Sequence, residues 1–189
     1  MKRLVIHIKG SSRYERMLKE MNTHYEGEFE IFDAIVNENP RKGISDSFKK
    51  IITDNYNEEC IHIFEDDVKF TAPKSRLIFE QAFSQIPEDW QLFLGGSYTY
   101  ENPIDFGDYM KVDNFRSLHS VIIRKSAYDL FLSHNPTEIY QNIDSWVAKQ
   151  NPVVYLCNPQ AMVQHDGYSY NARKQTDYSR FLKDKNILN

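Results

Sequence analysis

The chain of 189 residues is poor in cysteine and has no long hydrophobic run. Its two cysteines, Cys60 and Cys157, each lie in an apolar segment typical of a strand. Neither has the spacing of metal ligands, so we interpret both as buried free thiols. The apolar stretch at residues 4–8 is interrupted by His7 and is too short for a signal-peptide core or a membrane span. We therefore expect a soluble protein of a reducing compartment, by default the cytoplasm.

An excess of positive charge is also missing. Asp and Glu together number 27 against 23 for Lys and Arg, which gives a net charge of -4. A dedicated nucleic-acid-binding protein usually carries a basic face, so this balance disfavours that class without excluding a local basic strip. No Gly-x-x-x-x-Gly-Lys-Ser/Thr segment occurs, which disfavours P-loop chemistry. The length suits one domain over residues 1–189, and no internal repeat or low-complexity linker divides it.

Apolar runs alternate with amphipathic segments along the chain. Strands are expected at residues 4–8, 29–35, 60–64, 92–94, 118–123, 153–156 and 161–163. Helices are expected after Ser11 or Ser12, from about 45, from 75 with Leu77 facing inward, from a cap at Ser126, over 137–148 and over 174–182. The breakers Pro40 and Gly43 predict a loop at 37–43, and the composition of 97–113 predicts a long functional loop. This order predicts an α/β domain with a largely parallel sheet.

Three consecutive carboxylates, Glu65, Asp66 and Asp67, follow the apolar strand at residues 60–64. In open α/β sheets, ligands bind beyond the carboxyl ends of the strands, where this triplet is expected. Adjacent carboxylates repel one another and are costly to bury. A divalent cation with oxygen ligands, Mn²⁺ or Mg²⁺, removes that conflict and keeps positions open for phosphate oxygens. The alternative is a solvated acidic turn without a ligand.

The segment IHIFEDDV at residues 61–68 resembles the strand-plus-acidic, DXD-like motif of glycosyltransferase family 25. That family contains the lipopolysaccharide and collagen-type galactosyltransferases. Further pieces follow in the family's order: VIHI with Arg13, FDAI at 32–35, GISDS at 43–47, and residues 119–128 followed by Asn142-Ile143-Asp144. Segment 43–47 departs from the family in lacking a cysteine and a histidine, and the chain is short for the family.

The resemblance implies a GT-A fold, with a Rossmann-type mixed, mainly parallel sheet flanked by helices. It also implies metal-dependent transfer of a sugar from a nucleotide-diphosphate sugar, a UDP-sugar by preference, to a hydroxyl acceptor with inversion. The acceptor stays open between a glycan, a lipid-linked sugar, a protein and a modified nucleobase.

The same resemblance suggests roles for the acidic residues and one histidine. Asp67 would ligate the metal, and Glu65 and Asp66 would contact the ribose or support the metal ligand. His165 follows a strand and precedes a turn, so it would be a second metal ligand or, equally, a surface histidine. Asp144 would be the catalytic base or, equally, a helix cap.

Other residues are candidates for the donor and the acceptor. Arg13 would meet the diphosphate near a helix start, or be a solvated helix residue. Gly95 and Gly96 would allow the donor to approach the backbone, or form a simple turn. A separate set would contact sugar, although each member could equally belong to the core or the surface: His119, Tyr98 and Tyr168.

Two other functions fit the same residues. A metal-dependent nucleotidyl or phosphoryl transferase on a related scaffold would use the same acidic cluster. A non-catalytic sugar-binding module would keep the fold without turnover. The chemically competent side chains at 65–67, 144 and 165 favour an enzyme over the binding module.

Overall fold

The computed structural model describes residues 1–136, 142–170, 173–182 and 185–187. The strands in this part of the chain are β1 (Lys2–His7), β2 (Glu30–Asp33), β3 (Cys60–Glu65), β4 (Val68–Phe70), β5 (Leu92–Leu94), β6 (Thr99–Asp105), β7 (Tyr109–Arg116), β8 (Ser120–Arg124), β9 (Val154–Cys157), β10 (Met162–Gln164), β11 (Gly167–Ser169) and β12 (Lys174–Thr176). The α-helices are α1 (Tyr14–Tyr25), α2 (Pro40–Asp54), α3 (Ser75–Phe83), α4 (Tyr128–Ser133) and α5 (Ile143–Ala148).

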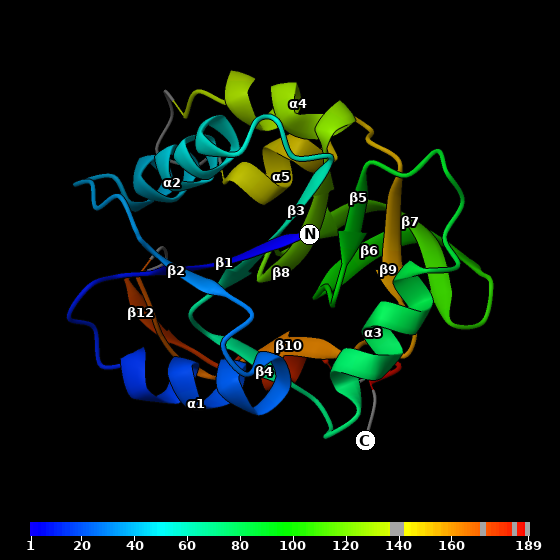
Figure 1. The fold of residues 1–189 in the computed structure, drawn as a ribbon, viewed down its shortest axis with the longest axis horizontal. Coiled ribbons are helices and arrows are strands. Elements are labelled where there is room, and N and C mark those ends of the chain that lie inside the picture. The colour runs from blue at the N-terminus through cyan, green and yellow to red at the C-terminus, as the bar shows by residue number, and fades with distance from the viewer. Residues whose placement is uncertain (137–141, 171–172, 183–184, 188–189) are drawn as a thin grey trace.

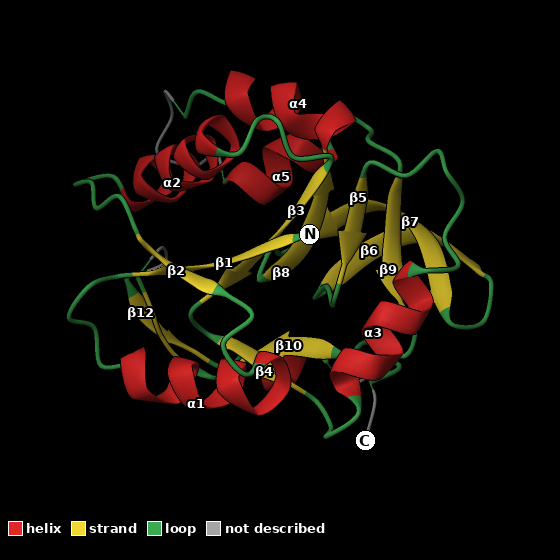
Figure 2. Cartoon of the chain, in the orientation of Figure 1, coloured by secondary structure: helices red, strands yellow, loops and turns green. Residues whose placement is uncertain are grey.

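A large mixed sheet forms the centre of the molecule, with strand order β2-β1-β3-β8-β5-β9-β7-β6. β8 runs antiparallel to β3 and β5, and β7 runs antiparallel to β9 and β6, so the other strands share one direction. Helices α2, α4 and α5 lie over one face of the sheet, and α1 and α3 lie over the other (Figures 1 and 2). The predicted fold class, a mainly parallel sheet flanked by helices, is confirmed.

The two faces of the sheet carry two separate hydrophobic cores. On β8, Val121 and Ile123 join the core that includes α2, α4 and α5, whereas Ile122 joins the core that includes α1 and α3. Successive side chains of a strand point to opposite faces, so a continuous apolar run such as this one needs cover on both sides. None of the helices in the described ranges is both long and apolar enough to cross a membrane.

Helix α2 begins earlier than the sequence predicts. Asn39 caps it by accepting a hydrogen bond from the backbone N–H of Arg41 at 3.1 Å, and Pro40 occupies the first turn, where a missing N–H costs nothing. The predicted loop at 37–43 is therefore wrong for residues 40–43. Gly43 lies inside this helix. A larger residue does not fit there, because a Cβ would stand 2.6 Å from the carbonyl oxygen of Ile35.

The predicted loop at 97–113 is also wrong, because most of it forms the β6–β7 hairpin at the edge of the sheet. An edge strand is exposed to solvent and therefore carries polar residues. β6 is such a strand, so its composition resembles that of a loop. The tail predicted as a helix over 174–182 contains β12 and a short 3₁₀ turn, Ser179–Phe181.

Smaller differences concern the helices on both faces. Leu77 is 62% exposed on α3 instead of facing inward. Ser126 lies in a 3₁₀ turn, and the side-chain cap predicted for it before α4 is absent in this part of the structure. Of the helix predicted over 137–148, α5 is its C-terminal part, and residues 137–141 lie outside the described residues.

A two-stranded sheet of β4 and β10 connects the end of β3 to the C-terminal part of the chain. Strand β4, which the sequence did not reveal, pairs antiparallel with β10 so that Gln164 lies opposite Val68. Gly96 makes the approach of β10 possible, because a Cβ there would lie 1.9 Å from the carbonyl oxygen of Met162. The backbone crossing at this glycine therefore holds β10 against the acidic turn.

We expect Gly96→Ala to lower the free energy of unfolding by about 3 kcal/mol, because the clash is with rigid backbone. Gly107→Ala is the matched control, since Gly107 has a φ of 95° and open space around it. That change should cost only about 1 kcal/mol of backbone strain. Urea denaturation of both variants measures the difference. Equal costs would show that no backbone crossing restricts position 96.

Candidate active site

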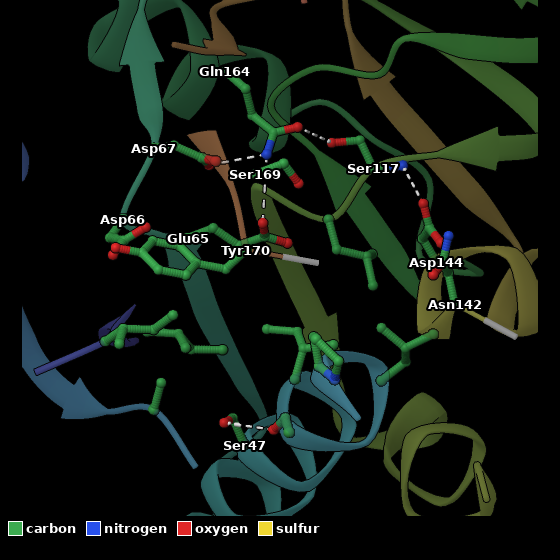
Figure 3. Close-up of a pocket in the computed structure, with 18 of the residues that line it drawn as sticks. Ser47, Glu65, Asp66, Asp67, Ser117, Asn142, Asp144, Gln164, Ser169 and Tyr170 are labelled. Carbon is green, nitrogen blue, oxygen red and sulfur yellow. Dashed lines mark hydrogen bonds between the residues drawn. The ribbon is translucent and has the colours of Figure 1, made fainter. Parts of the chain in front are cut away.

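A cavity of about 420 Å³ opens at the carboxyl ends of β1, β2 and β3. One side of it is apolar and is lined by residues from these strands and from α2, among them Ile6, Ile8, Ala34, Ile35, Pro40 and Ile44. The other side is polar and contains Glu65, Asp66, Asp67, Gln164, Asp144 and Arg13. Figure 3 shows the carboxylates, Gln164 and Ser117 arranged around this space.

Asp66 is the member of the triplet that pairs with the protein. Its Oδ2 lies 3.0 Å from Nδ1 of His7, and its Oδ1 accepts a hydrogen bond from Arg13 at 2.6 Å. The side chain is only 6% exposed. Since both oxygens are occupied by protein groups, Asp66 anchors Arg13 and the end of β1.

Arg13 connects Asp66 to the cavity. Its Nη1 also donates to Oδ2 of Asp67 at 3.0 Å, and its Nη2 donates to the carbonyl oxygen of Tyr168. Burial lowers the pKa of Arg13, but the charges of Asp67 and Asp66 outweigh burial and raise it overall. A permanent positive charge therefore lies at the acidic turn.

Glu65 and Asp67 lie where burial opposes the ionised form of a carboxyl group. Burial is the main cause that raises the pKa of Glu65, and the charges of Asp67, Asp144 and Asp66 raise it further. Burial also raises the pKa of Asp67, although Arg13 opposes this. A negative charge is thus costly at both carboxylates as long as no further cation is near.

Gln164 lies between these two carboxylates. Its Nε2 donates to Oδ1 of Asp67 at 2.9 Å and to Oε2 of Glu65 at 3.4 Å, and its Oε1 accepts from the hydroxyl of Ser117 at 3.3 Å. The backbone N–H of the next residue, His165, donates to the carbonyl oxygen of Asp67 at 2.8 Å, which fixes the end of β10 at the acidic turn.

Asp144 lies in the first turn of α5 and lines the opposite side of the polar half. Its Oδ2 accepts from the backbone N–H of Ser117 at 3.0 Å, and its Oδ1 accepts from that of Ser145 at 2.6 Å. The helix cap predicted as one explanation is wrong, because Asn142 occupies the cap position and Asp144 lies in the turn that follows it. Asp144 does have the cavity position that a base needs. Oδ1 also accepts from the hydroxyl of Ser145 at 3.2 Å, so Oδ2 is the oxygen with a lone pair for a further proton or ligand.

Ser117 adopts a backbone conformation that is unusual for serine, with a φ of 102°. Such a conformation costs on the order of 1–3 kcal/mol and persists only where the surroundings impose it. Here it directs the amide of Ser117 to Asp144 and its hydroxyl to Gln164. The strained residue therefore connects the predicted base to the acidic pair.

His165 is placed differently from the metal ligand that the sequence suggested. It does not line the cavity, and its buried Nε2 has no hydrogen-bond partner in the described part of the chain. Burial lowers its pKa to about 4, and the charges of Arg16 and Lys69 add to this. The residue that faces the carboxylates is its neighbour Gln164, because successive side chains at the end of a strand point in opposite directions.

The predicted donor glycines and sugar-binding residues divide into two groups. Gly95 and Gly96 do not line the cavity. Gly95 permits the close approach of the side chains of Ser120 and Met162, and Gly96 permits that of the Met162 backbone. His119 is 1% exposed and lies behind the cavity wall. Tyr98 and Tyr168 do line the cavity, and Tyr98 stacks on Tyr178 with ring centroids 5.1 Å apart.

The architecture matches that of several solved structures. Protein A197 from STIV is 13% identical over 94% of this chain and 95% of its own, with a TM-score of 0.57. A glycosyltransferase involved in the glycosylation of the major capsid of PBCV-1 is 12% identical over 97% and 89%, with a TM-score of 0.51. The inositol-1-phosphate CTP transferase from T. maritima is 14% identical over 100% and 80%, also with a TM-score of 0.51. No protein-family model and no curated protein matches the chain.

The fold is GT-A-like. Its structural neighbours include both a glycosyltransferase and a nucleotidyltransferase, so the fold alone does not choose between the two reactions.

Sequence reasoning missed three residues that line the cavity: Gln164, Ser117 and Tyr178. A signal was present for Gln164, because the two-residue period of β10 places 164 and 165 on opposite sides. No comparable pattern marked the positive φ of Ser117 or the stacking of Tyr178 on Tyr98.

We expect Glu65→Gln to raise the melting temperature of the metal-free protein at pH 7.5 by about 2–4 °C, the shift that ~1 kcal/mol gives in a domain of this size. The pKa of Glu65 is raised in the folded state, so its ionisation destabilises the fold as the pH rises above the value of the unfolded chain. The gain should therefore vanish near pH 4, where the carboxyl is protonated in both states.

Asp66→Asn is the matched control for this prediction. Asp66 pairs with Arg13 and His7, so its neutralisation should lower the melting temperature under the same conditions. Calorimetric melting of both variants in the presence of a chelator measures the two signs. Destabilisation by Glu65→Gln would contradict the uncompensated charge at that position.

Proposed function

We propose that the chain is a metal-dependent glycosyltransferase that moves a sugar from a nucleotide-diphosphate sugar to a hydroxyl acceptor. The observation that supports this most is the pair Glu65 and Asp67 at the end of β3. Both carboxylates line the cavity and both have a raised pKa, although Arg13 lies 3.0 Å from Asp67. A site of this kind favours a ligand that brings further positive charge.

The donor set suits Mg²⁺ or Mn²⁺ held together with a diphosphate. No group of three or more His, Cys, Asp and Glu side chains that could hold a metal ion occurs within the described ranges. Mg²⁺ is usually bound through one or two carboxylates plus substrate phosphates, without a complete protein cage. Glu65 and Asp67 provide such a partial set, and a cation bound there would neutralise the charge of the departing nucleoside diphosphate.

The two sides of the cavity suit the two parts of a nucleotide sugar. The apolar side near Ile8, Ile35 and Pro40 offers a surface for a flat nucleobase. Arg13 lies at the polar side, where its guanidinium can donate to phosphate oxygens. Tyr98 and Tyr168 offer aromatic surface to a sugar ring.

Asp144 is the group that we assign to the proton of the acceptor. In a single displacement with inversion, the acceptor oxygen forms a bond to the anomeric carbon while the bond from that carbon to the diphosphate breaks. The hydroxyl proton passes to a carboxylate oxygen of Asp144, and the nucleoside diphosphate leaves with the electron pair. Hydrogen bonds from the backbone of Ser117 and Ser145 hold this carboxylate in place.

Sugar transfer from a UDP-sugar is favoured over the alternatives by the motif around the acidic turn, which resembles glycosyltransferase family 25. The PBCV-1 neighbour supports sugar transfer, since it is a glycosyltransferase involved in the glycosylation of the major capsid. The T. maritima neighbour, a CTP transferase, keeps nucleotidyl transfer as the second candidate. The acceptor class stays open between a glycan, a lipid-linked sugar, a protein and a modified nucleobase.

We expect UDP to bind about 10-fold more tightly in the presence of Mn²⁺ than in the presence of a chelator, because the cation joins the diphosphate to the carboxylates. Asp67→Asn should remove this dependence, whereas Asp113→Asn, on β7 and outside the cavity, should keep it. Isothermal titration calorimetry measures all three proteins. If the affinity for UDP changes neither with Mn²⁺ nor with Asp67→Asn, the metal assignment is wrong.

We expect Asp144→Asn to lower kcat by about 10²–10⁴-fold, the usual contribution of a general base, while the affinity for UDP stays within about twofold. The measurement is product formation from a panel of nucleotide sugars with candidate acceptors. Release of an intact nucleoside diphosphate supports sugar transfer. Release of pyrophosphate from a nucleoside triphosphate would assign the site to nucleotidyl transfer instead.

A further inference from the structure

The surroundings of Gln164 point to a role beyond holding two carboxylates apart. Gln164 is the last residue of β10 and is 9% exposed. Its terminal amide lies between the acidic pair and Ser117 (Figure 3). An amide carries an oxygen at one end and an NH₂ group at the other, so a rotation of 180° exchanges an acceptor for a donor without moving the rest of the side chain.

The protonation state of His119 determines which group accepts the hydrogen bond from the hydroxyl of Ser117. Its Nε2 lies 3.2 Å from the carbonyl oxygen of Met162, which can only accept, so Nε2 must carry a proton. Burial lowers the pKa of His119 to about 4, so the ring holds one proton at neutral pH and Nδ1 is a bare acceptor. Nδ1 is in hydrogen-bond contact with the hydroxyl of Ser117 and therefore receives its proton.

The hydroxyl of Ser117 consequently has no second proton for Gln164. Its oxygen is 3.3 Å from Oε1 of Gln164, and a hydroxyl donates only once. In the arrangement with the NH₂ group toward the carboxylates, either Nδ1 of His119 or Oε1 of Gln164 lacks a donor. Rotation of the amide removes this conflict, since Nε2 then donates to the oxygen of Ser117.

Rotation of the amide places its oxygen, in place of the NH₂ group, next to the carboxylates of Glu65 and Asp67. Its oxygen takes the place of Nε2, which lies 2.9 Å from Oδ1 of Asp67 and 3.4 Å from Oε2 of Glu65. Three oxygens at such distances repel one another unless a positive charge lies between them. Amide and carboxylate oxygens are also the ligands that Mg²⁺ and Mn²⁺ prefer.

We propose that Gln164 supplies a third protein oxygen to the cation site of Glu65 and Asp67. Ser117 and His119 set the orientation of its amide, so that arrival of the cation satisfies the whole network. Without the cation the NH₂ group faces the carboxylates, and with the cation the oxygen does. This inference rests on the proposed metal-dependent function and assigns to Gln164 a ligand role that the sequence had suggested for His165.

The test depends on the sign of one effect. If Gln164 ligates the cation, Gln164→Leu should weaken Mn²⁺ binding by about 10–100-fold, as loss of a supporting group does at metal sites. If Gln164 only donates to the carboxylates, it competes with the cation, and Gln164→Leu should leave Mn²⁺ binding unchanged or strengthen it. That second result would overturn the ligand role.

Mn²⁺ binding is measured by calorimetry and by electron paramagnetic resonance, with and without UDP. Gln164→Met, which keeps the length of the side chain and removes the amide, should weaken Mn²⁺ binding in the same way, and it tests the ligand role if the leucine variant does not fold. Gln160→Leu is the matched control, since Gln160 is a buried glutamine outside the cavity, and it should bind Mn²⁺ like the wild type.

The orienting role of Ser117 has its own variant. Ser117→Gly removes the hydroxyl and also relieves the positive φ, so a loss of Mn²⁺ affinity cannot come from added backbone strain. We expect a loss of about 3–10-fold, smaller than that of Gln164→Leu, because the ligand oxygen is still present. Unchanged affinity would remove Ser117 and His119 from the inference.

The outcomes separate this inference from the proposed function. A wild-type protein that binds Mn²⁺, with a Gln164→Leu variant that binds it equally well, overturns the role of Gln164 alone. A wild-type protein that binds no Mn²⁺, either free or with UDP, rejects the metal-dependent function and the role of Gln164 with it.

Discussion

The uncompensated negative charge at the end of β3 is the constraint on which the rest of the site depends. Three consecutive carboxylates at the end of a buried strand line the cavity. Asp66 pairs with His7 and Arg13, and Asp67 shares the same arginine. A fold selected only for stability would avoid this arrangement, because burial raises the pKa of Glu65 and Asp67 and opposes their ionisation. The arrangement becomes favourable when a ligand brings positive charge, as substrate-bound metal ions do.

The fold supports this turn from three directions. β1 and α1 supply His7 and Arg13, β10 supplies Gln164, and the segment before β8 supplies Ser117. The close approach of β10 depends on Gly96, which contacts the carbonyl oxygen of Met162 too closely to allow any side chain. This backbone crossing allows β10, and with it Gln164, to lie next to the acidic turn. Functional groups placed by rigid strands in this way are held more accurately than groups on loops.

The sequence predicts the architecture and the acidic turn well, because both depend on local patterns. Continuous apolar runs identify β3, β5 and β8, and the charges after Phe64 stand out against them. The sequence predicts less well what depends on contacts between distant segments. The wrong loop at 97–113 arose because an edge strand has a loop-like composition, and the early start of α2 depends on a cap at Asn39. The two-residue period of β10 places Gln164 and His165 on opposite sides, but only the pairing of β10 with β4 determines which of the two faces the carboxylates.

The same fold occurs in enzymes of two reaction types, so the fold alone does not determine the reaction. Glycosyl transfer and nucleotidyl transfer both need a cation and a diphosphate or triphosphate at the end of the central strands, and neighbours of both kinds share this fold. What differs is the group that meets the attacking nucleophile. Nucleotidyl transfer to a phosphate uses a nucleophile that is already ionised, whereas sugar transfer to a hydroxyl needs a base for its proton. We propose Asp144 for this role, since the backbone of Ser117 holds it on the far side of the same network, and this proposed role is the reason to favour a hydroxyl acceptor.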